Sequence, residues 1–376
     1  MQRVMWSHRR QLLDQGVLLP GSGTADHFRA AIDVRRQPEL LRDPSSSVDA
    51  WRRLVAEVAE WDGDAVVSHE LFAPASAEQV AAAMDELGDA EVHVVFTARD
   101  LARQVPAEWQ EHLKHRSVLT FPEFVRSVRA DAERGPFSPN GYYFWDEQDV
   151  PRLVERWGSG LPRQHVHVVT VPRSGTPAEE LWARFAGLVG IDPGGFELAA
   201  APSNSSLCAE QAELLRRLNS RLGARLPLPG TYPEMVKEVL AHRILADREG
   251  TRFGLVGEDL AYAVERSKEM ATRLHDLGVD VVGDLEELVP LMLDQEVSGD
   301  AAVSADPVLD EAVEALAEVL DRLASERNRR HRLRAELDEA RSRIRQIEGR
   351  GSSTQDRVRI VFAARKVRRR WQRTRS

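Results

Sequence analysis

The sequence contains one cysteine, Cys208, among 376 residues. A single cysteine can neither close a disulfide within the chain nor supply the several thiolates of a structural zinc site. No run of eighteen apolar residues is present, and the first residues lack the apolar core and small-residue cleavage site of a secretory signal. These absences exclude a disulfide-stabilised secreted protein and an integral membrane protein. We therefore predict a cytoplasmic protein without a metal.

What the sequence does contain is typical of a folded, soluble domain. Hydrophobic residues make up 42% and charged residues 30% of the chain, which is long enough to bury a sizeable core. The net charge of −9 conceals a basic end, because residues 351–376 hold nine lysines or arginines and one aspartate. Such a tail predicts contact with an anionic membrane surface or another polyanion. The alternative is a solvated end that contacts nothing.

Short apolar runs alternate with helical patterns over the first two hundred residues. The runs bounded by turn residues are typical of buried strands, and they are 65–68, 92–97 and 166–171, with a short extended piece at 17–20. Apolar residues at helical spacing predict helices over 1–16, 50–61, 76–87, 109–115, 121–134 and 178–189. This alternation predicts an α/β fold in which helices cover both faces of a parallel sheet.

The remainder of the chain is mainly helical and ends in a separate segment. We divide the sequence into an α/β domain with a helical C-terminal part (1–298), a linker (299–307), a long helix (308–349) and the basic tail (350–376). Apolar residues in the long helix follow a heptad-like spacing, in which four of six pairs are apolar and the middle two are interrupted. Self-association through 309–347 and a lone helix both remain open.

Two polar side chains follow the apolar run that ends near Ser68. His69 and Glu70 come where ligands bind in open α/β sheets, beyond the carboxyl ends of the strands. An imidazole or a carboxylate in that position can accept a proton during catalysis. The alternative is a structural one, in which Ser68 caps the start of a helix.

Arg99 follows the next apolar run, and its planar, permanently charged guanidinium is suited to a phosphate. The alternative is a surface ion pair with Asp100. Residues 172–176 form a third polar connection, whose backbone N–H groups could hold a phosphate at a helix N-terminus. That segment lacks the glycine pair and lysine of a Walker loop, so an ordinary connection is the competing interpretation.

Several stretches carry a family resemblance, and they occur in the family's order. They are 91–111, 16–21, 26–31, 68–71, 167–172 with 181–185, and 204–207. On these residues the chain resembles the sulfotransferase-like proteins of actinobacterial type that depend on 3′-phosphoadenosine 5′-phosphosulfate (PAPS). The resemblance implies a P-loop-like parallel sheet flanked by helices, with a C-terminal helical extension. It also implies transfer of a sulfuryl group from PAPS to a hydroxyl or amine acceptor, such as one on a glycan or lipid.

Particular residues receive roles from this resemblance. Arg99 would hold the 3′-phosphate of PAPS, and Glu70 or His69 would be the base. Asn204 and Ser206 would lie near the nucleotide from the far side of the sheet. Aromatic residues within 137–149 are candidates for the wall of the acceptor pocket, or else plain packing.

The chain departs from the family pattern at two places. Ala107 stands where the family's 3′-phosphate motif has a serine, and the family's first strand and its Pro-Lys-x-Gly-Thr-Thr loop would precede Met1. We expect either a longer natural protein or a shortened relative that does no catalysis. A rival hypothesis is a non-catalytic scaffold that uses the long helix and the basic tail. A third combines both, with the tail holding an enzyme at the inner membrane surface.

Overall fold

The computed structural model describes residues 1–130, 144–177, 179–198, 206–246, 248–291, 299 and 303–348. Asn204, residues 137–143 and the basic tail lie outside the described residues. Contacts between residues divide the chain into two units, Met1–Ala312 and Val313–Ser376. Within the described ranges, no helix combines the length and the apolar character needed to cross a bilayer.

The strands of the described residues form two small parallel sheets. β1 (Val17–Leu18) pairs with β2 (Asp64–Ala65), and β4 (Val166–Thr170) lies between β3 (Val94–Ala98) and β5 (Asp280–Val282). All five residues of β4 are buried, as expected for the middle strand of a covered sheet. The predicted strand 65–68 is shorter than expected, because its ladder to β1 ends near Val66. The predicted α/β class with parallel strands is confirmed.

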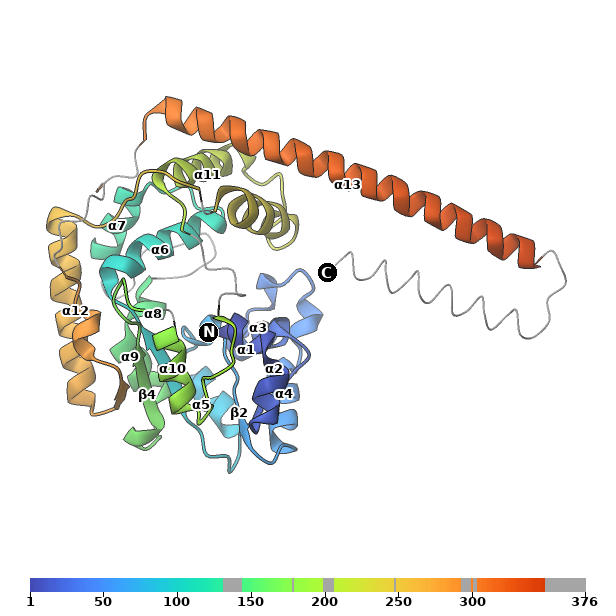
Figure 1. Cartoon of the computed structure of the whole chain (residues 1–376). Coiled ribbons are helices and arrows are strands. Elements are labelled where there is room, and N and C mark those ends of the chain that lie inside the picture. The colour runs from blue at the N-terminus through green and yellow to red at the C-terminus, as the bar shows by residue number, and fades with distance from the viewer. Residues whose placement is uncertain are drawn as a thin grey trace. The chain divides into compact units, whose positions relative to one another are not determined.

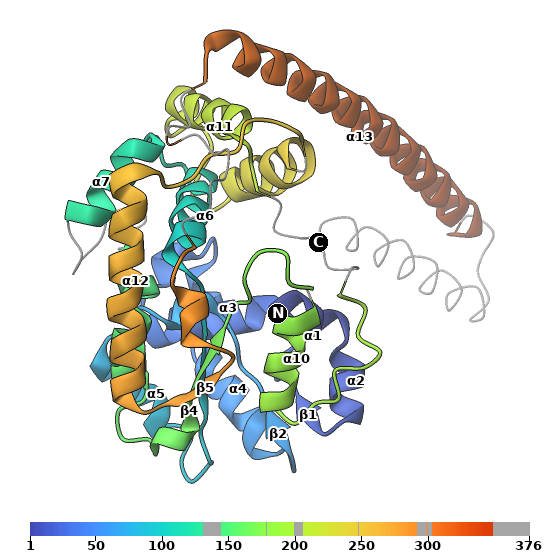
Figure 2. The same ribbon diagram turned by 60° about the vertical axis from the view of Figure 1, so that its left-hand side comes forward.

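Helices flank both sheets (Figures 1 and 2). α9 packs against β3, and α10 packs against β4 and β5. The α-helices are α1 (Gln2–Ser7), α2 (Arg9–Asp14), α3 (Thr24–Arg35), α4 (Ala50–Ala59), α5 (Ala77–Asp85), α6 (Leu101–Lys114), α7 (Phe121–Ala130), α8 (Phe144–Gln148), α9 (Val150–Trp157), α10 (Glu179–Leu188), α11 (Ala209–Leu222), α12 (Gly257–Leu277) and α13 (Ala305–Glu348). The shorter helical segments are η1 (Pro38–Leu40), η2 (Pro44–Ser47), η3 (Glu70–Phe72), η4 (Arg163–His165), the π-helix η6 (Pro233–Leu245) and η7 (Leu285–Leu288).

One apolar cluster connects the two sheets. Val66, which follows β2, and Val95 of β3 both pack against a buried cluster that includes Met5, Trp182 and Phe185. The two sheets therefore share a core although the described strands β2 and β3 do not pair. Burial of large apolar side chains such as these provides most of the favourable free energy of folding.

Helix α6 begins earlier than the sequence predicted, because Asp100 caps it. The Asp100 carboxylate accepts a hydrogen bond from the Arg103 backbone N–H at 3.0 Å, and the helix continues through Pro106. At the other end, buried Asn219 donates to the carbonyls of Leu113 (2.8 Å) and Ser117 (2.9 Å). Because helix-end carbonyls need partners when buried, Asn219 fixes α11 against α6.

Helix α13 is a single segment of 44 residues. It begins at Ala305, so its first turn takes up the last residues of the predicted linker. Five of its apolar side chains are 57–61% exposed: Leu309, Val313, Leu316, Leu320 and Leu323. Monomeric proteins seldom leave large apolar side chains exposed in a continuous stripe.

Candidate functional site

The loop that carries His69 and Glu70 is anchored by a buried histidine. His27 is 1% exposed; its Nε2–H donates to the Pro20 carbonyl at 3.0 Å, and its Nδ1 accepts from the Ser68 N–H at 3.2 Å. Burial lowers the pKa of His27, which keeps the imidazole neutral. His27 thus joins the segments that follow β1 and β2 and sets where the next two side chains point.

The side chain of His69 is hydrogen-bonded to the backbone of its own loop. It caps η3, and its Nδ1 accepts a hydrogen bond from the Leu71 N–H at 3.1 Å. The neutral ring therefore carries its proton on Nε2 and has no lone pair left to accept another. The helix-start interpretation is correct for this loop, but the cap is His69 and not Ser68. Burial lowers the pKa of His69; the negative charge of Glu70 opposes this shift, and the positive charge of Lys237 adds to it.

Glu70 faces a group of carboxylates that sequence reasoning missed. Its carboxylate is 70% exposed and accepts a hydrogen bond from Gln2 Nε2 at 3.2 Å. The negative charge of Glu70 raises the pKa of both Glu108 on α6 and Glu147 on α8. We name Glu70, Glu108, Glu111 and Glu147 the carboxylate cluster.

Two lysines supply positive charge to this cluster. Lys237 Nζ of η6 lies 3.2 Å from Glu111 Oε2 and donates to His115 Nε2 at 2.9 Å. Lys114 Nζ lies 2.7 Å from the other oxygen of Glu111. Despite burial, the two lysines hold the pKa of Glu111 at about 2. Glu111 is therefore ionised near neutral pH and balances the lysines.

In contrast to Glu111, the carboxyl groups of Glu108 and Glu147 have raised pKa values. Burial and the charges of Glu111 and Glu70 raise the pKa of Glu108 to about 7. Burial and the charge of Glu108 raise the pKa of Glu147 to about 8, and Glu147 Oε1 has no hydrogen-bond partner among the described residues. A carboxyl group with a pKa near 7 can both give and take a proton near neutral pH. The cluster can therefore perform acid–base chemistry.

Arg99 follows the last residue of β3, and the structure leaves its charge unpaired. Asp100 forms its ion pair with Arg103 instead, and Arg103 also donates to the carbonyls of Val171 (3.3 Å) and Pro172 (2.8 Å). Among the described residues no ion pair involves Arg99, and its Nε is buried without a hydrogen-bond partner. The alternative Arg99–Asp100 pair is wrong. Burial lowers the pKa of Arg99, so an anion at this position would be stabilising.

The candidate residues fall into two groups along α6. Arg99 lies at the start of the helix, and Glu108 lies about 13 Å further along its axis at 1.5 Å per residue. Ser206 is exposed, and its neighbour Leu207 donates its N–H to Gln110 Oε1 at 2.8 Å. Ser206 therefore lies beside the second half of α6, away from Arg99. A ligand that used all of these residues would have to follow the helix.

The third polar connection has partners of its own. Arg173 donates to the Glu286 carbonyl at 2.7 Å, and Arg184 Nη2 donates to Glu287 Oε1 at 2.9 Å. The Arg184 hydrogen bond holds the pKa of Glu287 at about 2. Side chains from η7 and α10 therefore fill the carboxyl end of β4, which fits an ordinary connection at residues 172–176. Phe144 (2% exposed) and Trp145 (0% exposed) are buried in the core, as the packing interpretation of these aromatic residues predicts.

Comparison of the chain with protein-family models, with curated proteins and with solved structures finds no match. The sequence did carry one signal for the carboxylate cluster, because Gln104, Glu108, Glu111 and His115 recur at helical spacing. Nothing in the sequence pattern pointed to Glu147 or Lys237, which come from other elements.

Proposed function

We propose that the protein binds the 3′-phosphate of an adenosine nucleotide at Arg99 and belongs to the sulfotransferase class. The observation that carries this proposal is the unpaired guanidinium of Arg99 at the carboxyl end of a parallel strand. Ligands of open α/β sheets bind at that edge, and Arg99 stands there between β3 and α6. Arg103 is paired with Asp100, whereas Arg99 has no ion-pair partner among the described residues.

The carboxylate cluster would supply the base for sulfuryl transfer. In that reaction the S–O bond to the leaving phosphate breaks, a bond from sulfur to the acceptor oxygen or nitrogen forms, and the acceptor loses a proton. Glu70 or Glu108 would take that proton, since the only lone pair of His69 is already used by Leu71. The acceptor is a hydroxyl or an amine.

The arrangement of the two sheets supports the same class. β2 and β3 do not pair, yet the residues beside them pack on one apolar cluster. A further parallel strand between β2 and β3 would join the two sheets into one. In the family that this sequence resembles, the loop that binds the 5′-phosphosulfate follows such a strand. We propose that this place in the fold is where that strand and loop belong.

Binding of adenosine 3′,5′-bisphosphate, measured by isothermal titration calorimetry, tests the proposal. We expect Arg99→Ala to weaken binding by 10- to 100-fold, because a charge-assisted hydrogen bond contributes roughly 1.5–3 kcal/mol. Arg99→Lys should recover only part of the loss, since lysine lacks the planar fork. Arg217→Ala is the matched control, because Arg217 pairs with Glu213 on α11.

Two results would overturn this proposal. One is the absence of heat when the full chain is titrated with adenosine 3′,5′-bisphosphate. The other is equal affinity of the Arg99→Ala and Arg217→Ala variants, which would show that the nucleotide binds elsewhere.

The exposed stripe of α13 favours a second function, self-association. We propose that its occupant is a second copy of the chain in antiparallel orientation. Residues 305–326 contain seven acidic residues and one arginine, whereas residues 327–348 contain eight arginines and four acidic residues. Two antiparallel copies would place the acidic half of each helix beside the basic half of the other, and this complementarity is lost in a parallel pair.

The heptad positions agree with the antiparallel arrangement. In the register that places Glu326 opposite Arg330, the other inner layers pair apolar residues only: Ala312–Ile344, Leu316–Ala340, Val319–Leu337 and Leu323–Leu333. In a parallel dimer each residue would face its own copy, so Glu326 would meet Glu326 and Arg330 would meet Arg330. Like charges in a buried seam are strongly unfavourable.

Cysteine cross-linking in a Cys208→Ser background determines the orientation. We expect a disulfide between a Leu323→Cys chain and a Leu333→Cys chain. Leu323→Cys alone should form little disulfide, because the two Cys residues at position 323 of an antiparallel dimer would be about 15 Å apart along the helix axis. The double variant Leu316→Ser with Leu323→Ser should weaken the dimer at least 100-fold in sedimentation experiments. A monomer at all concentrations, or efficient self-linking of Leu323→Cys, would contradict the proposal.

A further inference from the structure

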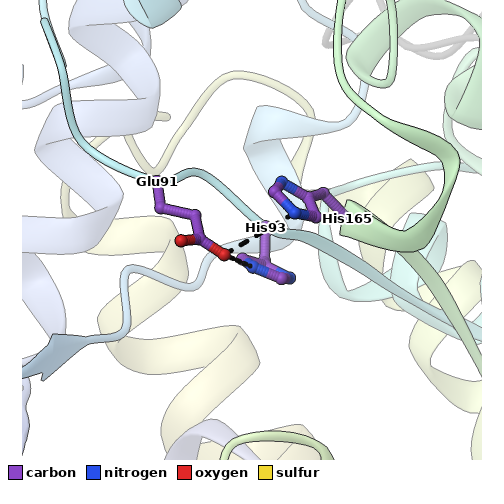
Figure 3. Close-up of side chains that lie close together, drawn as sticks. All are labelled: Glu91, His93 and His165. Atoms are coloured by element: carbon purple, nitrogen blue, oxygen red, sulfur yellow. Dashed lines mark hydrogen bonds and ion pairs between the residues drawn. The ribbon is translucent and has the colours of Figure 1, made fainter.

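A second group of titratable residues lies at the amino ends of the strands in the three-stranded sheet. Glu91 and His93 precede β3, and His165 ends η4 immediately before β4 (Figure 3). Because Val94 pairs with Val166, the same register places His93 beside His165. Arg99 lies at the opposite, carboxyl end of β3, so this group is separate from the proposed nucleotide site.

One possible ligand atom of each of the three side chains lies close to those of the other two. Glu91 Oε1 lies 3.0 Å from His93 Nε2 and 3.6 Å from His165 Nε2. All three atoms lie within 4.8 Å of one another. Zinc binds nitrogen and oxygen ligands at about 2.0–2.2 Å, so two ligands of a tetrahedral zinc ion are about 3.3 Å apart. The two measured separations fall on either side of that value.

A hydrogen-bonded chain behind His93 determines which ring nitrogen carries the proton. His167 Nδ1 lies 2.7 Å from Asp280 Oδ2, and His167 Nε2 lies 2.8 Å from His93 Nδ1. A carboxylate only accepts, so His167 donates its Nδ1–H to Asp280. With one proton on each ring, His167 then accepts at Nε2 and His93 donates from Nδ1. This assignment leaves His93 Nε2 with a lone pair.

That lone pair points at another acceptor. His93 Nε2 and Glu91 Oε1 are 3.0 Å apart, and without a positive charge between them two lone pairs would face each other at hydrogen-bond distance. Either an additional proton or a metal ion resolves this conflict. Histidine ligands of metals commonly donate their second ring N–H to a carboxylate or another acceptor, as His93 does here through His167.

We propose that Glu91, His93 and His165 bind a divalent transition-metal ion of the zinc type. Two imidazoles and one carboxylate suit zinc and its first-row neighbours, and three protein ligands leave a fourth position for water. The ligands are open to solvent, with side chains 72%, 42% and 20% exposed for Glu91, His93 and His165. A metal ion can therefore enter from solution. His167 and Asp280 are positioning residues, which fix the orientation of His93.

Titration of the full chain with zinc chloride, in buffer free of chelators, tests this site. We expect one zinc ion per chain, with affinity at least 100-fold weaker in His93→Ala and at least 10-fold weaker in Glu91→Gln. His331→Ala is the matched control, because His331 is an exposed histidine of α13. The substituted ligands are largely exposed, and circular dichroism will confirm that the variants fold.

Cobalt(II) gives a second measurement, because its visible absorption reports the coordination geometry. We expect a tetrahedral cobalt spectrum from the unmodified chain and none from His93→Ala. Asp280→Asn should keep one bound ion per chain but weaken it by 10- to 100-fold and change the cobalt spectrum. The absence of zinc heat and of a cobalt band, or equal binding by His93→Ala and His331→Ala, would overturn the metal site.

Discussion

At pH 9 the Glu147→Gln variant is expected to be more stable than the unmodified protein, and at pH 4 the two are expected to be alike. The pKa of Glu147 is raised from 4.5 to about 8, first by burial and then by Glu108. Below pH 4.5 the carboxyl is protonated in both the folded and the unfolded chain. As pH rises, the unfolded chain releases this proton first, so folding loses stability until the pH exceeds 8.

The size of the effect follows from the shift. One pKa unit corresponds to about 1.4 kcal/mol, so ionised Glu147 costs at most on the order of 5 kcal/mol of folding free energy. Glutamine carries no charge and avoids most of this cost. Thermal unfolding at both pH values measures the difference, which we expect to exceed 5 °C at pH 9. Glu108→Gln should behave similarly, with its transition centred on pH values below 7.

A surface carboxylate provides the control for this experiment. Glu155 lies 3.3 Å from Arg273 and is 47% exposed, so Glu155→Gln should change stability only slightly at either pH. If Glu147→Gln were less stable than the unmodified chain at pH 9, the carboxyl would not be held in its neutral form. Residues whose replacement stabilises a protein are often retained for function. A stabilising Glu147→Gln would therefore strengthen the assignment of the carboxylate cluster as a site.

Most strands of the fold could be predicted from the sequence, because they are short, apolar and bounded by polar turns. Residues 166–171 contain one internal charged or titratable side chain, His167, and become the buried middle strand. The start of α6 was placed too late, since Pro106 and the polar residues around it obscure the apolar spacing. Asp100 determines the true start, and a cap that precedes an interrupted pattern is difficult to recognise without coordinates.

The candidate site could be predicted only in part from the sequence, because its properties depend on which partner each side chain contacts in the fold. Arg99 is the nearer of the two arginines to Asp100 in sequence, yet Asp100 pairs with Arg103, and no ion pair of Arg99 is found among the described residues. Likewise, the sequence presents His69 and Glu70 as equivalent candidates for the base. The structure distinguishes them, because His69 Nδ1 already accepts a hydrogen bond from the Leu71 N–H. Charge pairing and tautomers are decided by three-dimensional geometry, which no spacing rule contains.

The proposed metal ligands did carry a signal, which the prediction of a metal-free protein overlooked. Glu91 and His93 are separated by one residue, as are His165 and His167, and each pair stands at the start of a strand. Alternate residues of an extended segment face the same side. When two such strands are neighbours in a parallel sheet, their first residues meet at one edge. The pairing of β3 with β4 was the missing information.

The largest loss of stability from a single methyl group is expected at Gly283, directly after β5. Its φ of +112° is rarely adopted by other residues, and a Cβ there would lie 2.0 Å from Thr170 Oγ1 and 2.4 Å from Arg184 Nη1. Both atoms belong to the network that includes Glu287 at the carboxyl end of β4. We expect Gly283→Ala to lower the free energy of unfolding by at least about 3 kcal/mol, from backbone strain and lost hydrogen bonds together.

Gly278, at the other end of the same short segment, separates backbone strain from crowding. Its φ is +61°, and a Cβ there would meet nothing within 4 Å. Gly278→Ala should therefore cost about 1 kcal/mol, the strain of the left-handed conformation alone. Combining Gly283→Ala with Thr170→Ala removes the closest contact, so the double variant should lose less than the sum of the two single variants. If denaturant unfolding showed equal losses of unfolding free energy for Gly283→Ala and Gly278→Ala, the Thr170–Arg184–Glu287 network would be able to move aside at little cost. The end of β4 would then be adaptable enough to admit a ligand, and the assignment of residues 172–176 as an ordinary connection would have to be withdrawn.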